Sequence, residues 1–251
     1  VNFTATVNAA ATGTVTFKDG SAALGTVPVV NGVATLSVTL FSAGEHSIAA
    51  TYNGDGCYGT SGNAFTQTVN STPTSTLLTS DLNPSTCGAK VNFTAKVNNP
   101  AATGAVQFFD GANPMGLPVP TVNGIATLSW STLSIGTHSI KAGYSGDNCF
   151  DGSTSNTVSQ VVNGVPTTTG LISDNNPSTC GAKVNFTATV NDPGATGTVQ
   201  FKDGVNPIGA PVPVVNGVAS ISVTYPSTGN HSITAVFAGT GCFDGSTSNK
   251  V

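Results

Sequence analysis

The sequence predicts an all-β protein made of three tandem two-sheet sandwiches of about seven strands each. Two observations carry this prediction. First, a stretch that ends in a cysteine and an aromatic residue occurs three times, at residues 31–58, 123–150 and 216–243. Second, no segment has a helical period, whereas short runs of alternating apolar and polar residues recur between turn signals.

The repeat also sets the domain count. Cys87 and Cys180, like Cys149 and Cys242, are 93 positions apart, so the second and third copies align without a gap. A chain of 251 residues with this period divides into modules at residues 1–70, 71–163 and 164–251. By comparison with the middle copy, we expect module 1 to lack its first strand and module 3 the end of its last strand. The chain would then be a segment of a longer array.

The middle copy is the template for the first strands. A Thr/Ser/Pro-rich linker and a short first strand lead into residues 91–97, VNFTAKV, whose apolar residues share one face of a half-buried strand. The next strand, residues 105–109, ends at Asp110-Gly111. This dipeptide suits a hairpin turn because both positions tolerate positive φ.

The second half of the template continues the same pattern. Residues 112–122 contain three prolines, which restricts them to an edge strand or an irregular connection. Asn123-Gly124 is another hairpin signal, and the strand after it places Trp130 on its inner face. A strand that begins near His138, a Gly/Asp loop and a final strand complete the sandwich.

Composition narrows the function. Charged residues are only 7% of the chain, with no Arg and a net charge of −4, so no basic patch for nucleic acid is expected. No apolar run is long enough to span a membrane. We expect no cofactor and no metal.

The combined order of motifs resembles the bacterial immunoglobulin-like (Big) repeat family. In module 1 the motifs read VNFTATV, TGTVTFKDG, VVNGVATLSVT and GEHSIAATYNGDGCYGTS, and the resemblance covers essentially the whole chain in three copies. It implies an immunoglobulin-like sandwich used in stalks, adhesins or filaments, located on the bacterial surface or outside the cell. The cysteines depart from the pattern, since the family generally lacks them.

Cysteine spacing suggests one disulfide within each complete module. Cys87 and Cys149 are 62 positions apart, and so are Cys180 and Cys242. We therefore predict the pairs Cys87–Cys149 and Cys180–Cys242, each worth roughly 4 kcal/mol in the chain-entropy model. Cys57 would be unpaired, or its partner would lie four positions before Val1; a bond to a neighbouring chain is the alternative. Zinc is a weaker interpretation because no CxxC is present, and regular disulfides place the protein outside a reducing cytosol.

Three other features have functional and structural interpretations. Residues 54–59, GDGCYG, match a dinucleotide-binding pattern by letter but precede no helix, so we interpret them as a β loop. The equivalent histidines His46, His138 and His231 are interpreted as packing or loop-bonding residues, since a catalytic histidine needs a nucleophile and an orienting carboxylate. Loop aspartates such as Asp55 and Asp147 could bind Ca²⁺, but hydrogen bonds to their own turns are favoured.

We therefore predict a structural module array, not an enzyme, from a bacterial extracellular filament or cell-surface stalk. Its partners would be neighbouring copies of the same module or chain. The alternatives are an adhesin or carbohydrate-binding module that contacts surface glycans or host and cell-surface proteins, or a spacer attached to a secreted enzyme. Completion of the end modules by strand exchange between subunits is a further possibility.

Overall fold

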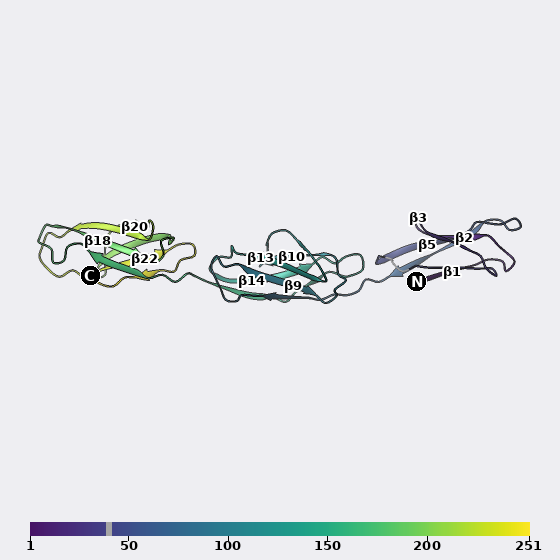
Figure 1. The fold of residues 1–251 in the computed structure, drawn as a ribbon, viewed down its shortest axis with the longest axis horizontal. Helices are drawn as coiled ribbons and strands as arrows, with labels where there is room; N and C mark the ends of the chain where they lie inside the picture. Colours follow the sequence, from purple (N-terminus) through teal and green to yellow (C-terminus); the bar gives the residue numbers. More distant parts are fainter. Residues whose placement is uncertain (39–41) are drawn as a thin grey trace.

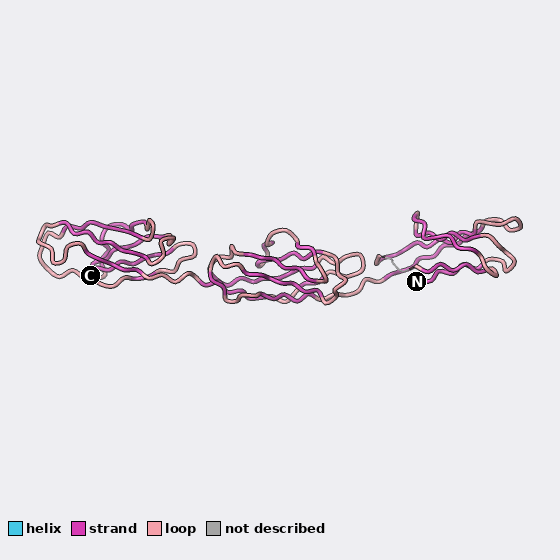
Figure 2. Tube along the Cα trace, viewed as in Figure 1, coloured by secondary structure: helices cyan, strands magenta, loops and turns pink. Residues whose placement is uncertain are grey.

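Three β-sandwiches lie end to end in the computed structural model, which describes residues 1–38 and 42–251 (Figure 1). Strands joined by loops and turns make up each sandwich (Figure 2). The described part of the chain contains no helix, and so none with the length and apolar character needed to cross a membrane. The all-β prediction is confirmed.

Module 2 is the most complete sandwich. Its strands are β7 (Thr76–Ser80), β8 (Ser85–Thr86), β9 (Val91–Val97), β10 (Ala105–Asp110), β11 (Asn113–Pro114), β12 (Val119–Pro120), β13 (Ile125–Trp130), β14 (Gly136–Tyr144), β15 (Ser153–Thr154) and β16 (Val158–Asn163). One sheet has the order β13-β9-β7, and the other β11-β10-β14-β16-β8, where β16 and β8 run parallel. The proline-rich segment forms short edge strands, as predicted.

The core of module 2 lies between these two sheets. Val91, Phe93, Ala95 and Val97 of β9 are each at most 1% exposed, which confirms the predicted alternation of this strand. They belong to one apolar cluster with residues of β10 and β14, and Trp130 packs partly buried against it. Burial of this apolar face is what fixes the register of the strand.

Module 3 repeats the arrangement. Its strands are β17 (Thr169–Ser173), β18 (Lys183–Val190), β19 (Gly197–Asp203), β20 (Asn206–Pro213), β21 (Val218–Thr224), β22 (Ile233–Gly239) and β23 (Ser246–Thr247). The sheets have the orders β17-β18-β21 and β20-β19-β22-β23.

Module 1 consists of β1 (Asn2–Thr6), β2 (Thr14–Asp19), β3 (Ala22–Pro28), β4 (Val33–Ser37), β5 (Gly44–Tyr52) and β6 (Ser61–Val69). Strand β1 pairs with β4, and the other sheet has the order β3-β2-β5-β6. A groove between β1 and β6 occupies the position that β7 takes in module 2, and Phe65 on its rim is 53% exposed.

The predicted Asn-Gly hairpins are present in all three modules. Asn31, Asn123 and Asn216 have φ values of 51°, 53° and 51°, and each is followed by a glycine with positive φ. At Gly124 a Cβ atom would lie 2.5 Å from the carbonyl oxygen of Asn99. Glycine is therefore required there both for its backbone conformation and for space.

Candidate functional site

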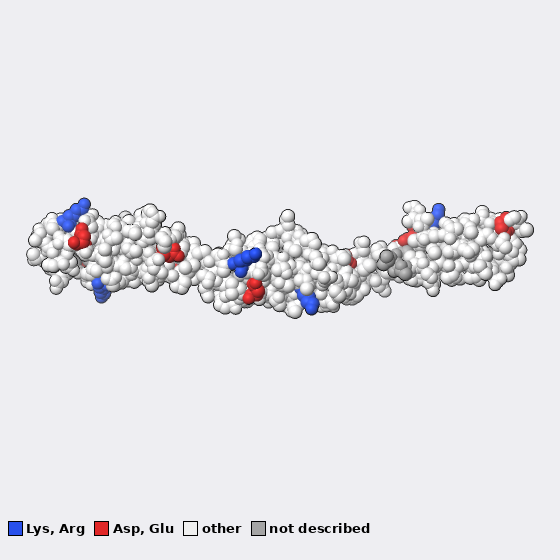
Figure 3. All heavy atoms as spheres, in the orientation of Figure 1, with Lys and Arg blue, Asp and Glu red and all other residues white. Residues whose placement is uncertain are grey.

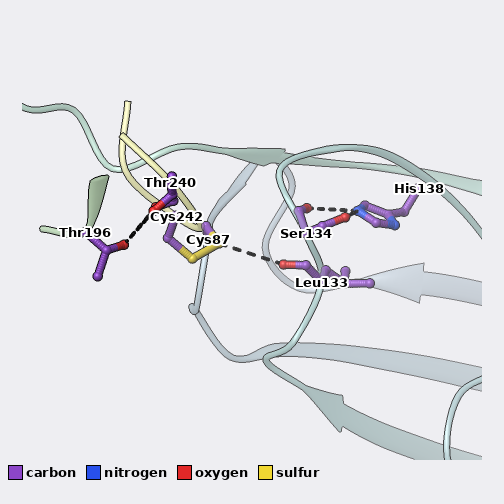
Figure 4. The surroundings of a disulfide bond; sticks show 7 residues. All are labelled: Cys87, Leu133, Ser134, His138, Thr196, Thr240 and Cys242. Atoms are coloured by element: carbon purple, nitrogen blue, oxygen red, sulfur yellow. Dashed lines mark hydrogen bonds between the residues drawn. A yellow bond between two sulfur atoms is a disulfide. The ribbon is translucent and has the colours of Figure 1, made fainter. Parts of the chain in front are cut away.

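The cysteines lie at the ends of the modules, and one pair joins two modules. Cys87 of module 2 is bonded to Cys242 of module 3, with a Cα–Cα distance of 5.4 Å and a sequence separation of 155 (Figure 4). The predicted pairs Cys87–Cys149 and Cys180–Cys242 are therefore wrong. The bond connects neighbouring sandwiches instead of closing one of them.

The geometry of a module explains the correction. Cys87 lies near Leu133, just before β14 begins, whereas Cys149 lies in the loop after β14 ends. The nine residues of β14, eight intervals of about 3.3 Å, separate these two ends by about 26 Å. A disulfide needs Cα atoms within about 7 Å. Two cysteines at opposite ends of one sandwich cannot meet.

The linker between modules 2 and 3 brings Cys87 and Cys242 together. The amide of Cys87 donates to the carbonyl of Asn163, the last residue of β16, at 2.8 Å. Two residues further on, the amide of Val165 donates to the carbonyl of Cys242 at 2.7 Å. Both cysteines are thus attached through their backbones to the same short piece of extended chain. The disulfide lies beside Gly164, where a Cβ atom would overlap the carboxylate of Asp244.

The junction between modules 1 and 2 has the same backbone arrangement. Thr72, the equivalent of Val165, donates to the carbonyl of Cys149 at 2.8 Å, and Asp151 donates back to Thr72 at 2.9 Å. A further bond crosses directly between modules, from the amide of Ala43 to the carbonyl of Asn148 at 2.7 Å. Cys149 therefore occupies at this junction the place that Cys242 occupies at the next one.

The two remaining cysteines, Cys57 and Cys180, carry free, exposed thiols. Cys57 lies in the loop between β5 and β6, where its amide donates to Asp55 at 2.8 Å. Cys180 lies in the turn before β18, and its thiol points at the carbonyl of Pro226 at 3.1 Å. The predictions for Cys57 are an unpaired thiol, a bond to a neighbouring chain, or a partner in its own module four positions before Val1. Such a pair would face the same obstacle of distance as Cys87 and Cys149.

Each histidine is paired with an aspartate at the end of a neighbouring strand. The Nδ1–Oδ2 distances are 2.6 Å for His46 and Asp19, 2.6 Å for His138 and Asp110, and 2.5 Å for His231 and Asp203. These aspartates belong to the Asp-Gly hairpins. The sequence predicts these aspartates only as turn residues, although each one lies 27 or 28 positions before its histidine.

The hydrogen bonds of the second ring nitrogen, Nε2, show whether a histidine of these pairs could act as a general base. In His138, Nε2 lies 2.9 Å from the carbonyl oxygen of Ser134 and 3.4 Å from its hydroxyl. A serine, histidine and aspartate are thus close together, but a general base must present an unprotonated Nε2 to the serine hydroxyl. Here the closer carbonyl requires an N–H donor. The geometry matches a structural bond that fastens the loop before β14, in line with the loop-bonding interpretation.

The charged form of the ring is favoured by these bonds. Burial disfavours the imidazolium of His138, but the bonds to Ser134 and Asp110 outweigh it and raise its pKa above the ordinary 6.5. The bond to Asp19, followed by that to Ser42, raises the pKa of His46 above the same value. The hydrogen bond from His231 lowers the pKa of Asp203.

The loop aspartates are occupied by hydrogen bonds from the protein. Asp147 accepts from the amide and hydroxyl of Thr103 at 2.7 and 2.9 Å, and from the amides of Cys149 and Phe150 at 2.9 Å each. Burial opposes ionisation, but these bonds hold the pKa of Asp147 well below its usual range. Asp55 repeats the pattern with Thr12, Cys57 and Tyr58.

The Asp147 carboxylate is thus saturated by donors, which supports the turn interpretation over a Ca²⁺ ligand. Nowhere in residues 1–38 and 42–251 do three His, Cys, Asp or Glu side chains group closely enough to hold a metal ion.

The fold and its junctions define a class of protein: a linear array of immunoglobulin-type sandwiches, with a disulfide that joins modules 2 and 3. The family model for the bacterial Ig-like domain (group 3) matches residues 1–70, 78–163 and 171–251. The chain belongs to this family, as its motifs indicated. Such domains are commonly found outside the cell or on its surface. A search of curated protein sequences finds no match.

The chain matches several solved structures at low TM-scores. They include fibronectin(III)-like modules of Clostridium thermocellum CbhA (17% identity, 69% of this chain and 93% of that chain, TM-score 0.29). Others are the I9–I11 tandem of titin (10%, 99% and 92%, 0.31) and the mouse nectin-like molecule 4 ectodomain (10%, 99% and 91%, 0.32). At TM-scores this low, we draw no conclusion from these likenesses.

Proposed function

We propose that this chain is a load-bearing segment of a bacterial extracellular filament or cell-surface stalk, with no catalytic role. The observation that carries the proposal is the disulfide between Cys87 and Cys242, which spans a module junction instead of a module. The side chain of Cys87 packs against the core of module 2, and its bond to Cys242 ties this sandwich to module 3. The bond contributes directly to the connection between them.

The position of the bond matters when the two ends of the array are pulled apart. Tension that enters module 2 at Ser71 passes along the chain to Cys87, crosses the disulfide to Cys242, and leaves through the end of module 3. The two cysteines are 155 positions apart in the sequence, and the residues between them lie outside this path. Fully extended, they would add about 530 Å at about 3.4 Å per residue. The bond withholds this length even if the sandwiches unfold.

The surface supports a mechanical role over a binding role. Figure 3 shows isolated blue and red groups on a largely uncharged face, with no concentrated patch of either sign on the side drawn. Trp130, the single Trp of the sequence, is half-buried: it packs against the core of module 2 and lines a surface pocket beside His138. An adhesin with an aromatic platform for sugars would present such a side chain to solvent.

Single-molecule stretching of the chain between its termini tests the proposal. At full extension, the contour length of the oxidised protein should be about 530 Å shorter than that of the Cys87→Ser variant. A Cys57→Ser variant, which leaves the bond intact, is the matched control and should behave like the unaltered chain. Equal contour lengths for oxidised and Cys87→Ser protein would rule out the proposed role of the disulfide. Binding of the oxidised chain on a glycan array would favour the adhesin alternative.

A further inference from the structure

The exposed thiols of Cys57 and Cys180 lie at opposite ends of the three modules. Strand β18 begins at Lys183, and its last residue, Val190, pairs with Thr169 beside the linker to module 2. Cys180, just before β18, is therefore at the far end of module 3. Strand β5 begins at Gly44, next to the junction with module 2, so the loop after it carries Cys57 to the far end of module 1.

Cys180 repeats the surroundings of Cys87. The two residues are 93 positions apart, and a glycine with positive φ follows each, Gly88 at 82° and Gly181 at 79°. The sulfur of Cys87 lies 3.9 Å from the carbonyl oxygen 46 positions further along the chain, and the thiol of Cys180 lies 3.1 Å from the equivalent oxygen. One of these two equivalent cysteines is already bonded across a junction.

Cys57 repeats the loop position of Cys149 and Cys242. Each of the three precedes an aromatic residue in the loop that follows the long central strand. In module 1 the carboxylate of Asp55 holds the amides of Cys57 and Tyr58, as Asp147 holds those of Cys149 and Phe150 in module 2. Cys57 therefore occupies the same loop position as Cys242, the cysteine that bonds Cys87, although Thr240 replaces the aspartate in the loop of module 3.

We propose that Cys180 and Cys57 are the two halves of one further junction disulfide, which forms head to tail between copies of this repeat. Cys180 of one chain bonds Cys57 of the next, as Cys87 bonds Cys242 within the chain. Because the two halves differ and lie at opposite ends, the contact is heterologous, and since the three modules lie end to end in a line, it extends the array instead of closing a ring (Figure 1). Such contacts generate open-ended assemblies. The inference rests on the proposed stalk function and gives it a covalent partner.

The chemistry requires a disulfide oxidant, such as glutathione disulfide. The thiolate of Cys57 attacks glutathione disulfide, forms a mixed disulfide and releases one glutathione thiolate. The thiolate of Cys180 then attacks the Cys57 sulfur and releases the second. Two protein thiols lose two protons and two electrons, and one glutathione disulfide becomes two glutathione thiols.

The test uses the full chain with Cys149→Ser, which leaves Cys57 and Cys180 as the cysteines outside the internal disulfide. The protein is incubated at high concentration in glutathione redox buffer, alkylated, digested without reduction and mapped by mass spectrometry. We expect Cys57–Cys180 links to exceed Cys57–Cys57 and Cys180–Cys180 links by at least about tenfold, a preference of about 1.4 kcal/mol. A Cys149→Ala variant repeats the test in case the serine disturbs the junction with module 1.

Other outcomes would overturn the inference. A statistical mixture of the three links would show only random oxidation of exposed thiols, and fully alkylated Cys57 and Cys180 would show that no bond forms. In protein isolated from its natural source, Cys180 should be linked to a cysteine that precedes an aromatic residue. The Cys57 peptide of a second copy supports the inference, whereas a peptide from a further module of the same polypeptide overturns it. The stretching experiment depends only on Cys87 and Cys242, so the two proposals can fail separately.

Discussion

The sulfur atoms of Cys87 and Cys242 connect two sandwiches beside a linker whose backbone is hydrogen-bonded to both cysteines. The linker and the disulfide therefore run in parallel between modules 2 and 3. A single extended chain between two sandwiches is a natural hinge, whereas two connections side by side resist bending and twisting. The disulfide at the junction between modules 2 and 3 therefore has a mechanical reason: it adds a second connection between two neighbouring repeats.

Removing the disulfide should weaken this part of the chain measurably. For a closed loop of 155 residues, the chain-entropy model gives a loss of about 5 kcal/mol for Cys242→Ser. Denaturant unfolding of modules 2 and 3 should shift to lower midpoint, and small-angle scattering should show a broader range of interdomain angles. Cys57→Ser is the control and should change neither. An unchanged midpoint for Cys242→Ser would contradict the prediction.

Gly124 should not tolerate a side chain. Gly124→Ala adds a Cβ that meets the carbonyl of Asn99 in a residue with φ of 72°, so we expect a loss of more than about 1 kcal/mol in the stability of module 2. Gly111→Ala is the matched control, since Gly111 has φ of 59° but no atom within 4 Å of the added Cβ. Thermal unfolding of both variants separates steric overlap from backbone strain. Equal losses would show that the contact with Asn99 is unimportant.

The His138–Asp110 pair should make stability depend on pH. The pKa of His138 is raised in the folded state above 6.5. Its contribution is therefore fully present below about pH 6.5 and is lost as the pH rises through the folded pKa. Chemical unfolding at a series of pH values should show module 2 weakening across this window. Asp110→Asn should flatten that dependence; an unaltered slope in this variant would disprove the role of the pair.

Asp147 should stabilise the loop at the junction with module 1, with the opposite pH dependence. Its pKa is lowered in the folded state, so its contribution is present above the unfolded pKa, near 3.8, and is lost as the pH falls through the folded value. Asp147→Ala leaves the amides of Thr103, Cys149 and Phe150 without their acceptor and should cost about 1–3 kcal/mol. Denaturant unfolding above and below pH 3.8 measures both effects.

Module 3 supplies the control for this substitution. At the equivalent position Thr240 bonds Thr196 through hydroxyl and carbonyl groups. Asp147→Thr should therefore restore part of the stability that Asp147→Ala loses, because Thr103 is the equivalent of Thr196. If the threonine variant is no more stable than the alanine variant, the loop does not depend on this side-chain pair.

The sequence predicted the sandwich well because its signals are local. The alternation of VNFTAKV follows from the pleat of a strand with one buried face, and Asn123-Gly124 follows from the positive φ of its turn. The histidines could be interpreted only in part. Their aspartate partners come from a strand that lies beside them in the sheet, and the pairing of β10 with β14 joins residues 28 positions apart.

The connectivity of the cysteines could not be deduced from their spacing. In a repeat of 93 residues, a separation of 62 within a module and one of 155 between modules are equally regular. The sequence by itself determined the repeat, the strands, their turns and the two kinds of cysteine. Only the tertiary structure decided that these two kinds lie at opposite ends of each sandwich. A long strand holds them too far apart to meet within one module, and the linker brings them together across the next boundary.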